Sequence, residues 1–192
     1  MAMKKLAFLG LAGLLVGLIS ACSGIVEVIV RLPIDFGQGN KLVITNARLS
    51  TNYYDGNSSN PTYYICDNKT TIITYSFTYN DPFYFGGWSS QLRGYASGEV
   101  KGQVNFSAND PRNNVATRTV TVDYQVYPGA VPLNNGTGAS VQSSGVSAQS
   151  IIVVPNPSIV GRTYVDILVK GANGAADLTG TVGPLKVIDN CP

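Results

Sequence analysis

The stretch TTIITYSFTY, residues 70–79, decides the fold class of this chain. Its large side chains recur at every second residue and so fall on one face of an extended strand: Ile73, Tyr75, Phe77 and Tyr79. Threonine and serine fill most of the alternate positions, on the opposite face. A period of two indicates a strand with one buried and one wet face, which is typical of antiparallel sheets.

Two further stretches repeat this alternation. Residues 99–107, EVKGQVNFS, place Val100, Val104 and Phe106 inward, and residues 117–126, TRTVTVDYQV, place Val120, Val122, Tyr124 and Val126 inward. Less regular strands are expected at 25–32, 41–49, 62–65, 91–97, 150–154, 163–170 and 184–189, with turn residues between them. About nine strands predict an all-β fold, namely an antiparallel β-sandwich that is Ig-like or related. A closed barrel is the alternative.

The stretch 128–149 differs from the rest because it is rich in Gly, Ser, Asn and Pro. It fits a flexible linker between two smaller β units, or a long loop with a weak edge strand at 139–148. We expect a single sandwich domain over 22–192, with 128–149 as a long excursion, because a disulfide between Cys66 and Cys191 would join the two halves.

The N-terminus carries an export signal. Lys4 and Lys5 precede an uncharged apolar run at 6–19, which we expect to form a signal helix that is too short for a membrane span. The small residues Ser20 and Ala21 then lead directly into Cys22. The sequence Ile-Ser-Ala-Cys resembles the lipobox of bacterial lipoproteins. An ordinary signal followed by a chance cysteine is the alternative.

The lipobox resemblance implies that residues 1–21 are removed and that Cys22 is lipidated. Its thiol would carry diacylglycerol and its new amine a fatty acid such as palmitate. Several acyl chains on one residue give a stable anchor. The chain would therefore lie on the cell membrane or outer membrane, facing the periplasm or the exterior. Ser23, in place of the Asp that resembles an inner-membrane retention signal, favours the outer membrane.

The charge of the chain argues against nucleic-acid binding, and its cysteine content predicts a disulfide. Without Lys4 and Lys5 the chain has 11 basic and 11 acidic side chains, which gives no electrostatic footprint for nucleic acid. In an exported protein, the remaining pair Cys66 and Cys191 predicts a disulfide, with two free thiols as the alternative.

No catalytic or metal-binding motif stands out. The chain has no histidine, which excludes Ser-His-Asp and Cys-His catalysis. The glutamates beyond the signal are Glu27 and Glu99, and nothing marks a convergent carboxylate pair. The Asx-rich stretches at 55–60 and 109–114 resemble calcium loops only loosely, and local turns explain them better. We therefore predict no enzyme activity, no metal and no cofactor.

The most unusual stretch is NDPFYFGGWSSQLRGY, residues 80–95. Its aromatic side chains are candidates for contact with a ligand or partner: Phe83, Tyr84, Phe85, Trp88 and Tyr95. Exposed rings stack on sugars or anchor protein partners, whereas rings folded inward would close one end of the sandwich. The expected function is a cell-envelope lipoprotein with a structural, assembly or protein-binding role. The alternative is a carbohydrate- or small-ligand-binding module that uses this aromatic loop.

Overall fold

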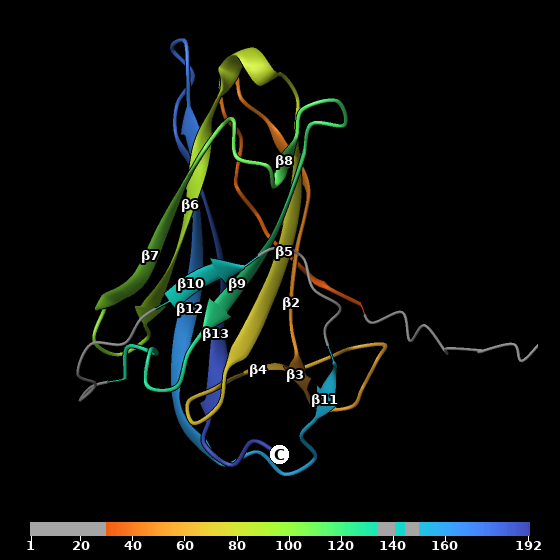
Figure 1. Cartoon of the computed structure of the whole chain (residues 1–192), viewed down its shortest axis with the longest axis vertical. Coiled ribbons are helices and arrows are strands. Elements are labelled where there is room, and N and C mark those ends of the chain that lie inside the picture. Colours follow the sequence, from red (N-terminus) through yellow and green to blue (C-terminus); the bar gives the residue numbers. More distant parts are fainter. Residues whose placement is uncertain (1–29, 134–140, 145–149) are drawn as a thin grey trace, which may run out of the picture.

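The computed structural model describes residues 30–133, 141–144 and 150–192, so Cys22 and the predicted signal lie outside the described residues. The fold consists of two β-sheets packed face to face, with a single turn of 3-10 helix, η1 (Pro82–Tyr84), at one end (Figure 1). The C-terminus lies at the opposite end. We call these the η1 end and the disulfide end.

The first sheet contains six strands, all paired antiparallel. In spatial order they are β1 (Leu32–Pro33), β2 (Ile44–Thr51), β5 (Thr71–Tyr79), β9 (Thr119–Val126) and β10 (Val141–Ser144), while β8 (Asn113–Asn114) also pairs with β9. The two strands with the strictest alternation, β5 and β9, are neighbours near the middle of this sheet. β10 is a short edge strand that lies within the 128–149 excursion.

The second sheet contains seven strands. In spatial order they are β11 (Ile152–Val153), β3 (Tyr53–Tyr54), β4 (Tyr63–Cys66), β13 (Leu178–Ile188), β12 (Ile159–Gly171), β6 (Phe85–Gly94) and β7 (Val100–Ser107). Two of its pairings are parallel, β11 with β3 and β13 with β4, and the others are antiparallel. The long strands β12 and β13 form the centre of the sheet.

The main hydrophobic core lies between the sheets, as the alternating patterns predict. The inward residues of β5 and β9 are no more than 3% exposed: Ile73, Tyr75, Phe77, Tyr79, Val120, Val122, Tyr124 and Val126. From the second sheet, Val165, Ile167 and Val169 of β12 face them with no exposed surface. Burial of these apolar surfaces is the principal favourable term in folding.

A second, smaller core lies at the disulfide end. It contains Tyr53, Tyr64, Cys66, Val154, Ile188 and Cys191, with Ile152 packed against it. Cys66 and Cys191 form the predicted disulfide, with their Cα atoms 6.2 Å apart and a sequence separation of 125. This bond ties the C-terminus to β4.

Strand β7 departs from the predicted alternation. Val100, expected inward, is 46% exposed, whereas the side chain of Lys101 is only 11% exposed. The pairing of β6 with β7 shifts register between Ser90 and Leu92, and Gly102 adopts a positive φ of 66°. A β-bulge inserts one extra residue, so the two faces exchange beyond it. The prediction that Val100 points inward was therefore wrong.

The all-β sandwich prediction is confirmed. Nine of the described strands have four or more residues, and four short ones have two. The strand expected at 91–97 in fact begins at Phe85 and ends at Gly94. Of the strand expected at 25–32, residues 25–29 lie outside the described residues, and Leu32 is the one residue of the described part, 30–32, that belongs to a strand. Within the described part of the chain, no helix has the length and apolar character needed to cross a membrane.

Candidate functional site

The aromatic stretch at 83–95 consists largely of β6, a strand paired on both sides, rather than a loop. Phe85 and Trp88 begin β6 and are 4% and 0% exposed. The Trp88 ring stacks on Phe106 at a centroid distance of 4.8 Å. Trp88 and Phe85 are core residues, so the prediction that they contact a ligand or partner was wrong. The alternative, that these rings fold inward, holds for both.

Trp88 also takes part in a buried polar cluster between the sheets. Its indole Nε1 donates a hydrogen bond to the Tyr75 hydroxyl over 2.9 Å, and that hydroxyl shares a short hydrogen bond with the Ser90 hydroxyl. Burial raises the pKa of Tyr75 far above its ordinary value, although the hydrogen bonds to Ser90 and Trp88 oppose this shift. Tyr75 is therefore a neutral hydrogen-bonding group that satisfies the indole inside the core.

The exposed aromatic residues of the stretch lie far apart. Phe83 in η1 is 61% exposed and Tyr95, directly after β6, is 53% exposed. β6 has ten residues, which separates its ends by about 30 Å at the usual rise per residue. Tyr84 is half-buried beside Phe83. The structure thus divides the predicted site into two surfaces, one at each end of β6 (Figure 1).

The first surface lies at the η1 end, around Asn80, which exchanges hydrogen bonds with the Val43 backbone and accepts one from Arg118, the residue whose N–H donates to the Val115 carbonyl. Its exposed apolar side chains are Val43, Phe83 and Val115, which are 40%, 61% and 52% exposed. We call it the η1-end patch. The backbone beneath Phe83 is fixed at two points. The Asp81 carboxylate accepts a hydrogen bond from the Phe83 N–H over 2.9 Å, and the Asn173 side-chain amide donates to the Phe83 carbonyl over 2.6 Å. The exposed ring therefore stands on a rigid turn.

Neighbouring contacts strengthen this turn. The Ala172 N–H donates to the Tyr84 carbonyl over 2.9 Å. The Lys41 ammonium lies 5.7 Å from the centre of the Tyr84 ring and donates to the Asn173 carbonyl over 3.4 Å. These contacts connect η1 to the turn between β12 and β13 and to the segment before β2. The Phe83 ring packs edge-on against Tyr84, with centroids 5.2 Å apart, and otherwise faces outward.

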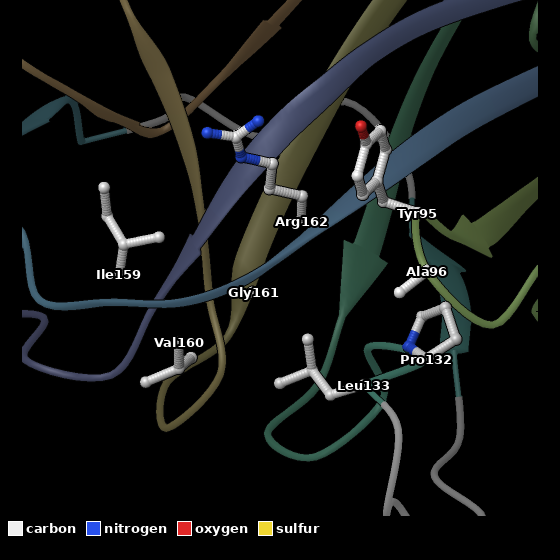
Figure 2. Close-up of a pocket in the computed structure, with 8 residues that line it drawn as sticks. All are labelled: Tyr95, Ala96, Pro132, Leu133, Ile159, Val160, Gly161 and Arg162. Carbon is white, nitrogen blue, oxygen red and sulfur yellow. The ribbon is translucent and has the colours of Figure 1, made fainter.

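The second surface is a hollow of about 560 Å³ toward the disulfide end. Figure 2 shows its lining, which comes from the β6–β7 turn, the chain after β9 and the start of β12: Tyr95, Ala96, Pro132, Leu133, Ile159, Val160, Gly161 and Arg162. Ile159 and Val160 are 49% and 44% exposed. A Cβ at Gly161 would overlap the end of the Leu133 side chain, so a larger residue there would require Leu133 to move. Most of the lining side chains are apolar, so the hollow is mainly apolar.

Arg162 and Tyr95 supply the polar groups of the hollow. The Arg162 guanidinium lies 5.9 Å from the centre of the Tyr95 ring. Arg162 forms no ion pair with any residue that the structure describes. An exposed guanidinium beside aliphatic side chains suits the binding of a carboxylate or phosphate.

A partly buried ion pair lies nearby on the same sheet. Arg93 of β6 holds Asp166 of β12 through two hydrogen bonds of 2.7 and 2.9 Å, and Thr181 donates a third of 2.8 Å. Burial alone would raise the pKa of Asp166, but the hydrogen bonds from Arg93 and Thr181 and the positive charge of Arg93 outweigh burial and lower that pKa. The Arg93 guanidinium also covers the Tyr164 ring at 4.5 Å. Because Arg93 and Asp166 are already engaged with each other and with Thr181 and Tyr164, this ion pair stabilises the fold and is not a binding site.

The Asx-rich stretches form local turns. Asp55 accepts a hydrogen bond from the Asn57 N–H over 3.0 Å, and Asn57 in turn accepts one from the Ser59 N–H over 3.2 Å. Asp110 accepts from the Arg112 N–H and pairs with its guanidinium, both at 3.0 Å. These oxygens serve the backbone, as the turn interpretation predicts. Among the described residues, no three Asp, Glu, Cys or His side chains form a metal-binding group.

No family model, curated protein or solved structure matches the chain. The function is therefore argued from the surfaces themselves. Sequence reasoning missed the hollow and assigned 150–154 and 163–170 only as strands. The available signal was the uncharged stretch IIVVPNPSIV at 151–160, whose six aliphatic residues exceed what one short strand can bury.

Proposed function

We propose that the protein is a lipid-anchored component of the bacterial cell envelope, with a structural, assembly or protein-binding role, and that it contacts a protein partner through the η1-end patch. The observation that supports the partner contact best is Phe83. It is the most exposed of the large apolar side chains described, and its turn is held by Asp81 and Asn173. A rigid exposed aromatic loses little entropy on binding, which is typical of residues that dominate interfaces.

The second part of the proposal is the lipid anchor, which is supported by the lipobox resemblance at Cys22. The envelope position would bring the η1-end patch to other proteins of the same compartment. The carbohydrate-binding alternative has lost its main support, because a stacking platform needs exposed coplanar rings and Trp88 has no exposed surface.

The experiment has two parts. The intact mass of the membrane-extracted protein should match the chain from Cys22 to Pro192 plus acyl groups. A photo-crosslinking amino acid at Phe83 should then join the protein to one discrete partner in intact cells. The same amino acid at Asn105, exposed on β7 away from the patch, is the matched control. Equal crosslinking at both positions, or none at Phe83, would refute the partner contact, and a mass without lipid would refute the anchor.

A further inference from the structure

One exposed segment has no role in the proposed partner contact. Residues 151–160, IIVVPNPSIV, carry no charge. Four of their aliphatic side chains are between 44% and 49% exposed: Ile151, Val153, Ile159 and Val160. The segment passes around the disulfide end of the molecule, from β11 to the start of β12 (Figure 1). We call it the foot segment. Apolar side chains gathered in this way mark a contact surface.

The fold holds the foot segment in this exposed position. The Ile152 and Val154 N–H groups donate to the Asn52 and Tyr54 carbonyls over 2.7 and 2.8 Å, so that these two side chains pack on the second core. The alternate side chains of the same strand must then point outward. Farther along, the Ser158 N–H donates to the Asn190 side chain over 2.7 Å. The exposure therefore belongs to an ordered segment.

The chain that leads to Cys22 leaves the domain next to the foot segment. The Val30 N–H donates to the Ser58 carbonyl over 3.3 Å, and the Tyr63 hydroxyl donates to the Val30 carbonyl over 3.1 Å. In the same β3–β4 loop, a Cβ at Gly56 would lie 2.9 Å from the Val153 side chain. Val153 thus packs against the loop that holds the first described residue of the chain.

The length of the intervening chain limits how far this region can lie from an anchor at Cys22. Eight residue steps join Cys22 to Val30, and a fully extended chain of that length spans roughly 27 Å. The η1 end lies on the far side of the sandwich and is the part of the domain best placed to point away from the bilayer. Val153, which lies beside this exit point, is correspondingly close to the lipid.

We propose that the foot segment rests in the interfacial region of the bilayer that holds the acylated Cys22, and so makes a second, reversible membrane contact. This inference rests on the proposed lipid anchor. Ile151, Val153, Ile159 and Val160 enter the boundary between headgroups and acyl chains. Tyr95 and Arg162, in the adjacent hollow, lie at headgroup level, where an amphipathic ring and a guanidinium that binds phosphate are favoured.

The contact is apolar rather than electrostatic. Asp189 is exposed beside the foot segment, where its N–H donates to the Ser158 carbonyl over 3.3 Å, and Asp67 is half-buried close by. These two carboxylates offset the charges of Arg162 and of Lys186, which is paired opposite Arg162 across β12 and β13, so the contact needs no anionic lipid and withstands high salt. A weak contact suffices, because the tether makes the binding intramolecular and gives a high effective concentration of bilayer.

The test places a photo-crosslinking amino acid at Val153 or Val160 of the lipid-anchored protein in native membranes, with Val115 at the η1 end as the matched control. Mass spectrometry of the adducts separates phospholipid from protein. We expect phospholipid adducts at both foot positions, with a yield about fivefold or more above that at Val115. Equal lipid adducts at all three positions, or a protein adduct at Val160, would overturn the membrane contact.

Substitution provides an independent check. Ile159→Asp with Val160→Asp should lower the lipid adduct at Val153 by about fivefold, because charged side chains leave the interface. Val43→Asp with Val115→Asp adds the same charge at the η1 end and should change that yield by less than about twofold. Both double variants alter exposed side chains only, and disulfide formation confirms that each is folded. An unchanged yield in the foot variant would contradict the proposal.

Failure of the anchor and failure of the foot contact are distinguishable. If Cys22 is not acylated in cells, the chain 22–192 can be coupled through the Cys22 thiol to a maleimide lipid in phosphatidylcholine vesicles. Lipid adducts at Val153 in that system would show that the foot contact is right although the proposed anchor is wrong. Acylated protein without such adducts would show the reverse.

Discussion

Removal of the Cys66–Cys191 disulfide tests how far this sandwich depends on a covalent link. Replacing both cysteines by alanine opens a loop with a sequence separation of 125. On the chain-entropy relation, a closed loop of this length raises the free energy of the unfolded state by about 5 kcal/mol. Native disulfides often contribute less than this relation gives, so we expect the double variant to lose about 3 to 5 kcal/mol.

The assay is reversible unfolding of the chain from Cys22, by urea and by heat. The expected loss corresponds to a fall in Tm of about 8 to 14 °C at the usual unfolding entropy per residue. Wild-type protein in a thiol reductant should match the double alanine variant, because both lack the same link. The double serine variant, Cys66→Ser with Cys191→Ser, is a second control: it also lacks the disulfide but places different side chains in the second core than the double alanine variant does.

Two outcomes would refute this reasoning. A loss of less than about 1 kcal/mol would mean that the unfolded chain is restrained by other means, so that the long loop carries little entropy. A large difference between the alanine and serine variants would place the effect in the second core, where Cys66 is fully buried and Cys191 is 8% exposed.

Three further changes probe the core, the ion pair and the bulge. Trp88→Phe should cost about 2 to 3 kcal/mol in urea unfolding, because it removes buried ring surface and deprives the Tyr75 hydroxyl of its indole donor. Asp166→Asn should cost about 1 to 2 kcal/mol, a figure reduced by the partial exposure of Arg93. The pKa of Asp166 is lowered by folding, so its stabilisation is complete above about pH 5 and is lost as the pH falls through the folded value. The acid sensitivity of the wild type should therefore exceed that of Asp166→Asn, and parallel pH profiles would contradict this assignment. Gly102→Ala should cost about 1 kcal/mol by thermal unfolding, since alanine is strained at a φ of 66°, and an unchanged Tm would argue against the bulge.

Local sequence patterns predicted the structure correctly where the folded chain keeps the arrangement that the pattern implies. In β5 and β9, alternation alone identified the buried face, because an unbroken strand turns successive side chains to opposite sides. Cys66 and Cys191 were paired by elimination, since the lipobox resemblance assigns the third cysteine, Cys22, to the anchor. The structure confirms both predictions.

Other features depended on contacts between distant segments. The glycines beside Trp88 suggested a loop, yet that residue belongs to β6, which is paired with β12 on one side and β7 on the other. The bulge at Gly102 reversed the faces of Val100 and Lys101, because one inserted residue changes the register of everything beyond it.

The sequence by itself determined the all-β class, the sandwich, the disulfide pair and the resemblance to lipoproteins, because each depends on residues near in sequence or on composition. Only the tertiary structure separated Phe83 from Tyr95 at opposite ends of β6. It also brought the foot segment beside the loop that holds Val30. Both results follow from the path of the chain through the sheets, and long-range strand pairing, which local patterns do not encode, sets that path.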